Sequence, residues 1–175
     1  LPGDGPVGAM LTSDPRVNGV AFTGSTETAL IIRRAMAENL DPTAPLIAET
    51  GGLNAMVVDS TALPEQAVRD IIASSFQSAG QRCSALRCLY LQEDIAPHVL
   101  EMLKGAMAEL TLGNPWDLAT DVGPVIDAEA QAGIAAHIAK ARSEGRVLAG
   151  LQAPGQGTFI APTVIRVAGI AEMGH

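Results

Sequence analysis

One cysteine and one glutamate in this chain lie in settings suited to chemistry. Cys83 occurs in the polar run Gly80-Gln81-Arg82-Cys83-Ser84, where no packing demand on the thiol is evident. A free thiol titrates near ~8.5, so a cysteine nucleophile needs a nearby cation or base. Arg82 favours the thiolate electrostatically, and Glu49 could take the proton or activate a water if the fold brings the two together. The pattern indicates a thiol nucleophile with a general base.

The short segment Thr23-Gly24-Ser25 is a second candidate site. It follows an apolar run and precedes a helical pattern, so the free N–H groups and the positive dipole end of the helix favour a pyrophosphate. Ser25 is expected to be the N-cap, and Glu27 in the first turn complements the dipole. The segment lacks a G-x-G-x-x-G fingerprint, so an ordinary strand-to-helix turn is the favoured interpretation from these residues alone.

The second cysteine has a different context from the first. Cys88 lies within the apolar run 86–91 and fits a buried structural thiol. The two cysteines are not arranged as a disulfide framework or a zinc site, and we predict no metal site. A cysteine hydrolase is disfavoured because no histidine lies in a recognisable partner context.

The segments that must position these residues alternate between strand and helix. Apolar spacing predicts one helix that begins at Ser25 and others over 64–78, 96–110 and 127–144. Short apolar runs predict strands over 17–22, 46–48, 55–58, 87–92, 146–149 and 159–167, with a surface loop over 152–157. Such alternation is typical of an α/β fold with a largely parallel sheet.

Composition limits the classes of function. The chain has 175 residues, 47% hydrophobic and 17% charged, which is typical of a globular α/β interior. Its net charge of −8 argues against contact with nucleic acid from this segment, because binding phosphates requires clustered Lys and Arg. No apolar run reaches the ~20 residues of a membrane helix, and we expect a reducing cytoplasmic location.

Four short runs occur in one order along the chain: Phe22-Thr23-Gly24-Ser25-Thr26-Glu27, Glu49-Thr50-Gly51-Gly52, Gly80-Gln81-Arg82-Cys83 and Asp121-Val122-Gly123-Pro124-Val125-Ile126. This order resembles the aldehyde dehydrogenase superfamily. The runs at 47–56 and 78–87 are most similar to the glutamate-semialdehyde dehydrogenase module of bifunctional proline-utilisation proteins. The similarity covers nearly the whole chain.

The resemblance implies an aldehyde dehydrogenase-like α/β fold. Residues 1–52 would be the C-terminal part of an NAD-binding domain, and 53–175 a truncated, parallel-sheet catalytic domain. It implies NAD as cofactor, with NADP an open alternative, and contacts to it from Thr23, Gly24, Ser25, Thr50 and Gly51. An upstream Asn of the oxyanion hole, the start of the cofactor fold and a downstream substrate loop would lie outside the chain, so the fragment alone is expected to be inactive.

The resemblance also assigns roles to individual residues. Cys83 would attack the aldehyde, and Glu49 would activate the water that hydrolyses the thioester, which favours hydrolysis over transfer to coenzyme A. Ser84 would bind the α-carboxylate of L-glutamate γ-semialdehyde, with Arg82 nearby. Phe76 has two open interpretations, packing against the aliphatic stem of the substrate or packing in the core.

The resemblance predicts an NAD-dependent enzyme of proline catabolism. We expect this chain to be a fragment of a longer parent protein. The expected partners are a small aldehyde substrate and further copies of that parent protein, and fusion of the parent to a proline dehydrogenase domain is left open. Two alternatives are an aldehyde dehydrogenase for another substrate and a catalytically incomplete fragment with a structural or oligomerisation role.

Overall fold

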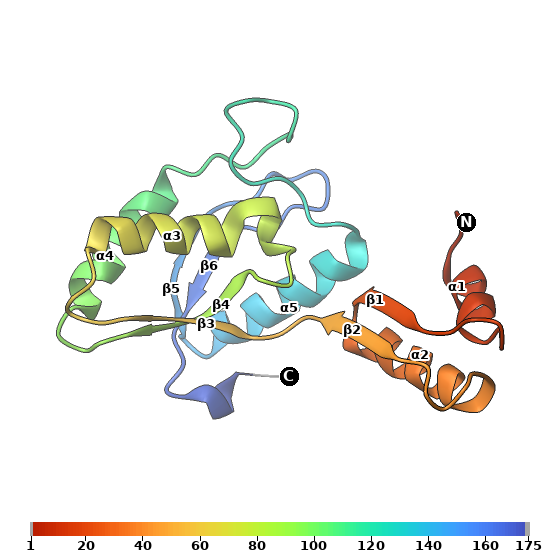
Figure 1. Cartoon of the computed structure of the whole chain (residues 1–175). Coiled ribbons are helices and arrows are strands. Elements are labelled where there is room, and N and C mark those ends of the chain that lie inside the picture. Colours follow the sequence, from red (N-terminus) through yellow and green to blue (C-terminus); the bar gives the residue numbers. More distant parts are fainter. Residues whose placement is uncertain (1, 174–175) are drawn as a thin grey trace. The chain divides into compact units, whose positions relative to one another are not determined.

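The computed structural model describes residues 2–173, and the chain divides into two compact units between Gly52 and Leu53 (Figure 1). The first unit contains α1 (Gly5–Thr12), β1 (Val20–Gly24), α2 (Thr26–Asn39) and β2 (Leu46–Thr50). β1 and β2 pair in parallel, from Val20 opposite Leu46 to Gly24 opposite Thr50. Parallel pairing places the carboxyl ends of both strands at one edge, which is where α/β proteins usually bind ligands.

Helix α2 covers this strand pair with one apolar face. Its buried residues Ile32 and Met36 form a cluster with Leu40, against which Phe22 and Leu46 also pack. The N-cap prediction is confirmed, because Ser25 Oγ accepts a hydrogen bond from the Thr28 amide at 3.1 Å. The helix α1 was not expected from the sequence, and its residues carry no buried side chain that would have produced a periodic pattern.

The second unit contains two strand pairs and the helices that connect or follow the strands. The pair β3 (Asn54–Val58) and β4 (Leu86–Leu91) is parallel, and the pair β5 (Val147–Gly150) and β6 (Thr163–Ile165) is antiparallel. The helical elements are α3 (Pro64–Phe76), η1 (Gln77–Gly80), α4 (Ala96–Ala108), α5 (Ala128–Ser143) and η2 (Ile170–Glu172).

The core of the second unit lies between α3, α4 and β4. Leu103 and Met107 of α4 are almost completely buried against Ile71 of α3 and Leu86 of β4. Both helices begin with a proline at N1 or N2, where its missing N–H costs nothing. This packing fixes the end of α3 relative to the start of β4, and the segment that contains Cys83 connects these two points.

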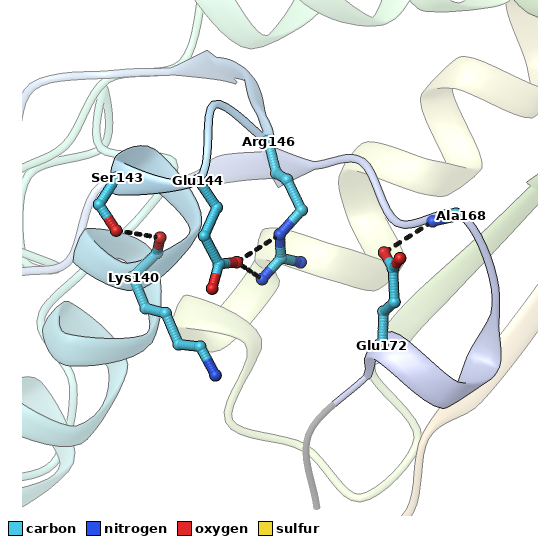
Figure 2. Close-up of polar contacts among 6 residues, drawn as sticks. All are labelled: Lys140, Ser143, Glu144, Arg146, Ala168 and Glu172. Carbon is cyan, nitrogen blue, oxygen red and sulfur yellow. Dashed lines mark hydrogen bonds and ion pairs between the residues drawn. The ribbon is translucent and has the colours of Figure 1, made fainter.

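The end of α5 has the hydrogen bonds of a Schellman motif. Gly145 has φ +69°, its amide donates to the Arg142 carbonyl at 3.1 Å, and the Arg146 amide donates to the Ala141 carbonyl at 2.9 Å. Figure 2 shows the side chains at this turn, where Arg146 forms an ion pair with Glu144 and Ser143 Oγ donates to the Lys140 carbonyl at 2.8 Å. The chain then enters β5.

The α/β class predicted from the sequence is confirmed, with differences in detail. The helix predicted over 64–78 ends at Phe76, because the backbone turns left-handed at Ser78 and Ala79. The strand predicted over 159–167 is limited to Thr163–Ile165, and its pairing with β5 is antiparallel rather than parallel. Within residues 2–173, no helix is long and apolar enough to cross a bilayer.

Candidate active site

Cys83 and Ser84 are the two central residues of one hydrogen-bonded turn. The Ala85 amide donates to the Arg82 carbonyl at 3.1 Å, which closes a four-residue β-turn over 82–85. Cys83 and Ser84 are both exposed, whereas Ala85 is fully buried and starts the chain into β4. The turn therefore exposes the Cys83 thiol and the Ser84 hydroxyl to solvent, while Ala85 at its end is fixed in the core.

The backbone that leads into this turn is strained. Ser78 and Ala79 have φ of 54° and 52°, and Gly80 follows at 69°. Positive φ costs about 1–2 kcal/mol for a residue with a Cβ, so two such residues in succession need surrounding contacts to hold them. Gly80 has no room for a side chain, since a Cβ there would lie 2.7 Å from the Ser75 carbonyl oxygen.

Long polar side chains anchor the segment between η1 and the turn. Gln81 Nε2 donates to the Ser78 carbonyl at 2.9 Å and to the Pro124 carbonyl at 3.3 Å, and Gln81 Oε1 accepts from the Ile126 amide at 2.7 Å. The guanidinium of Arg82 donates to the Ala73 carbonyl at 3.1 Å, near the end of α3. The exposed Arg82 side chain thus has one contact with the helix that precedes the turn.

Asn54 binds the turn from the neighbouring strand. Its side-chain amide donates to the carbonyls of Cys83 and Ala85 at 2.6 and 2.9 Å. The β3–β4 register shifts at this point, because Asn54 pairs with Leu86 but Ala55 pairs with Cys88. Arg87 is the extra residue of this bulge, and its guanidinium donates to the Gly80 carbonyl at 2.5 Å.

Phe76 lies at the last position of α3. It is half-buried and packs at the edge of the α3–α4 core. It also lines an open pocket of about 600 Å³ together with Ile72, Ala73 and Val122. The lining of the pocket also includes the charged residues Glu65, Arg69 and Asp121.

The remaining candidate residues lie at one edge of the first unit. In the β1–β2 register Thr23 is opposite Glu49, and Gly24 is opposite Thr50. Glu49 is exposed and lies within β2, not beyond its end as the sequence suggested. Ser25 caps α2 directly after β1, and Gly51 follows β2 with open space where a Cβ would stand.

The structure thus describes the candidate residues as two groups. Arg82, Cys83 and Ser84 share one turn in the second unit, with Phe76 at the end of the preceding helix. Thr23, Gly24, Ser25, Glu49, Thr50 and Gly51 share one strand edge in the first unit. Across residues 2–173, no group of three or more His, Cys, Asp or Glu side chains is arranged to hold a metal ion.

Sequence reasoning missed the three residues that hold the Cys83 segment. Asn54, Gln81 and Arg87 act through backbone carbonyls, and the bond from Asn54 to Cys83 spans 29 positions. A single sequence contains no signal for such pairings.

The chain belongs to the aldehyde dehydrogenase family, whose model matches residues 1–169. It is 56% identical over 99% of its length to the bifunctional protein PutA of Escherichia coli, and 40% identical over 98% to the 1-pyrroline-5-carboxylate dehydrogenase of Bacillus cereus. It spans only 14% and 34% of these relatives, respectively.

Solved structures show the same fold. The chain superposes on a variant of proline utilization A from Bradyrhizobium japonicum with a TM-score of 0.92, at 51% identity, covering 98% of this chain and 18% of that one. It also superposes on betaine aldehyde dehydrogenase of Staphylococcus aureus in complex with NAD+, with a TM-score of 0.82 at 31% identity, covering 91% of this chain and 32% of that one. The aldehyde dehydrogenase-like fold predicted from the motifs is confirmed.

Proposed function

We propose that this chain is part of an NAD-dependent enzyme that oxidises L-glutamate γ-semialdehyde to glutamate, the semialdehyde being in equilibrium with 1-pyrroline-5-carboxylate. The observation that carries the proposal is the exposed Cys83 thiol in a braced turn that also presents Ser84. The names of two relatives, PutA and 1-pyrroline-5-carboxylate dehydrogenase, support the choice of substrate.

The edge of the first unit suits a dinucleotide cofactor. The capped start of α2 offers helix amides and the positive dipole end for a pyrophosphate, next to Thr23 and Gly24. Gly51 and Gly52 have open space on the side where side chains would stand, so a planar ring could approach that backbone. NAD accepts a hydride from the substrate carbon when it is bound. We assign its contacts to Thr23, Gly24, Ser25, Thr50 and Gly51.

Cys83 is the proposed nucleophile. Its thiolate adds to the aldehyde carbon, and the carbonyl π electrons move onto oxygen to form a hemithioacetal alkoxide. With NAD bound, loss of hydride from the alkoxide carbon would leave an acyl thioester on Cys83 Sγ. The Cys83 backbone amide is the proposed donor to the oxyanion, because it belongs to the same residue as the attacking sulfur.

Glu49 is the proposed base for the second half of the reaction. Its carboxylate removes a proton from water, the hydroxide adds to the thioester carbon, and the Cys83 thiolate leaves as glutamate is released. The exposed position of Glu49 at a strand edge supports this role, because the carboxylate is accessible to water.

Three residues are proposed for substrate recognition. The Ser84 hydroxyl, next to the nucleophile, would donate to the α-carboxylate, and Arg82 would add positive charge near it. Phe76 would pack against the aliphatic stem of the substrate, which its position at the end of the helix that leads to the Cys83 turn supports.

We also propose the wider organisation of the parent protein. The unit over 1–52 would be the end of an NAD-binding domain, and the unit over 53–175 part of the catalytic domain. The parent would be a cytoplasmic homo-oligomer, and its similarity to PutA supports fusion to a proline dehydrogenase domain.

The test is NADH formation by the full-length protein that carries these residues. Glutamate semialdehyde is compared with a short aliphatic aldehyde, and Cys83→Ala is compared with Cys88→Ala. The matched control is apt because Cys88 is buried in β4 and exposes no thiol for chemistry. We expect preference for the semialdehyde, abolished by Cys83→Ala and largely retained by Cys88→Ala.

Two results would decide against the proposal. Equal or better turnover of the aliphatic aldehyde would favour an aldehyde dehydrogenase for another substrate. NADH formation that survives Cys83→Ala, or none at all in the wild-type protein, would reject the mechanism and favour a structural role.

A further inference from the structure

We propose that Asn54 is a positioning residue that holds Cys83 and Ser84 in their reactive arrangement. The inference rests on the proposed function, since it assigns a purpose to a turn whose two central residues are the proposed nucleophile and the proposed carboxylate-binding residue. Asn54 acts through backbone carbonyls and has no role in bond making or breaking.

The contacts of Asn54 are specific to this turn. Both bonds come from the same nitrogen, Nδ2, which donates to the Cys83 carbonyl at 2.6 Å and to the Ala85 carbonyl at 2.9 Å. A side-chain amide has two N–H donors, so these two acceptors use both. The turn is thereby tied to β3 at its centre and at its last residue.

Fixing the Cys83 carbonyl also fixes the residue that follows. The Cys83–Ser84 peptide is planar and trans, so its N–H points opposite to its carbonyl. Because the carbonyl is directed at Asn54, the Ser84 amide faces the other way. Asn54 therefore sets the rotation of the peptide between the two proposed functional residues.

The β-bulge explains why Asn54 can reach the turn. The register shift after Asn54 leaves Arg87 as the extra residue, and its guanidinium holds the Gly80 carbonyl. One irregularity thus directs two side chains at the two ends of the same segment, Arg87 at the start and Asn54 at the turn. Bulges commonly re-aim side chains beside functional sites.

Two variants of Asn54 separate a hydrogen-bonding role from a space-filling role. Asn54→Asp keeps the shape, but an ionised carboxylate accepts hydrogen bonds and would face two carbonyl oxygens with no proton to donate. Asn54→Ala removes the donors without this repulsion. We expect kcat/KM for the semialdehyde to fall roughly 10–100-fold, with Asn54→Asp the worse variant. A space-filling role predicts the reverse order.

The matched control is Ser74→Ala. Ser74 Oγ accepts from the Leu86 amide at 3.2 Å, so it braces the same strand start without bonding to Cys83 or Ala85. Its kcat/KM is expected to stay within about threefold of wild type. In the Asn54 variants kcat should fall and KM should rise together, because the same turn contains Cys83, the proposed nucleophile, and Ser84, the proposed carboxylate-binding residue.

Hydrogen exchange gives a readout that needs neither NAD nor substrate. The Ala85 amide is protected by the Arg82 carbonyl, so a loosened turn exchanges faster. We expect exchange over 82–85 to be about 5–30-fold faster in both Asn54 variants and unchanged in Ser74→Ala. Thermal unfolding shows whether Asn54→Asp folds. If it does not, the exchange rates and kcat/KM of Asn54→Ala are compared with those of Ser74→Ala.

The outcomes are distinguishable from those of the proposed function. Three results would overturn the role of Asn54 while leaving the dehydrogenase proposal intact. They are an unchanged exchange rate over 82–85 in the Asn54 variants, faster exchange there without a loss of kcat/KM, and a loss of kcat/KM in Ser74→Ala equal to that in the Asn54 variants. A wild-type protein that does not oxidise the semialdehyde would overturn the proposed function and the purpose assigned to the turn, and the exchange experiment would still decide whether Asn54 holds it.

Discussion

The two cysteines of this chain have opposite environments at the scale of single residues. Cys83 is exposed in its turn, whereas Cys88 is buried in β4 with its sulfur 3.3 Å from that of Met173. Accessibility decides which thiol a substrate can reach. The sequence contexts pointed the same way, because polar residues surround Cys83 and apolar residues surround Cys88.

Replacement of Glu49 by Gln in the full-length protein is expected to separate the two halves of the reaction. Attack by Cys83 does not need the carboxylate, so NADH should appear in a burst of about one equivalent per site. Loss of the general base should then slow steady turnover by roughly 10²–10⁴-fold. Stopped-flow absorbance measures both phases, and Glu27→Gln in the first turn of α2 is the control. Steady turnover at the wild-type rate would remove Glu49 from the mechanism.

Asp59 is expected to make stability depend on pH. Hydrogen bonds from the side chain and backbone of Thr61 hold the pKa of Asp59 below its ordinary value. A depressed folded-state pKa stabilises the protein above the unfolded pKa of about 3.9, and this stabilisation is lost as pH falls through the folded value.

Thr61→Val should therefore lower the urea midpoint at pH 7 and have a smaller effect near pH 3. The side-chain bond from Thr61 Oγ1 to Asp59 Oδ1, 2.6 Å long, is the contact removed. Unfolding curves at the two pH values provide the measurement. A difference of the same size at both would show that the Asp59 carboxylate is not the group involved.

At the scale of elements, the end of α3 determines the path of the segment that leads to Cys83, the proposed nucleophile. α3 ends at Phe76, and the three residues Ser78, Ala79 and Gly80 all have positive φ before the chain reaches Gln81. Such a sharp reversal lets the backbone leave the helix and return to β4 within a short segment. The strain is offset by the core packing of α3 and by the side chains of Gln81 and Arg87.

The glycine that ends α5 gives a prediction about an element. Gly145 has φ +69°, so Gly145→Ala is expected to destabilise the protein by about 1 kcal/mol. Gly133 lies inside the same helix with open space around it, so Gly133→Ala should stabilise by about 0.5–1 kcal/mol. Chemical unfolding of both variants measures the change in the free energy of unfolding. A change in the same direction for both variants would contradict the prediction.

At the scale of the whole molecule, the chain is two compact units within a family of longer proteins. It spans 34% of the Bacillus cereus relative and 14% of PutA from Escherichia coli. Several large apolar side chains between 116 and 126 are exposed, among them Trp116 at 92% and Ile126 at 84%. Exposed apolar surface of this kind is usually covered in a larger protein.

We therefore expect the isolated chain to form no NADH above the background of its Cys83→Ala variant. The proposed reaction needs a complete cofactor site and a substrate loop, and the chain carries only a part of the length of its relatives. The assay compares the isolated chain with the full-length protein at equal concentration, with circular dichroism to verify that the chain is folded. Cys83-dependent turnover by the isolated chain would contradict this expectation.

Much of the fold could be predicted from local patterns. The N-cap at Ser25, the buried strand around Cys88 and the alternation of helices and strands follow from residue type and spacing, which depend on neighbours a few positions away. The helix predicted over 127–144 is α5 (Ala128–Ser143), and the structure shows Asp127 as its N-cap, accepting from the Ala130 amide at 2.8 Å. Where local pattern and tertiary packing agree, the sequence was sufficient.

Other features came only from the tertiary structure. The end of α3 at Phe76, the antiparallel β5–β6 pair and the bulge after Asn54 depend on segments far apart in the chain. The sequence by itself determined the family, the α/β class and the polar surroundings of Cys83. Tertiary structure decided that Cys83 and Ser84 share a turn held by Asn54, because a hydrogen bond between residues 29 positions apart exists only once the β3–β4 register has been set.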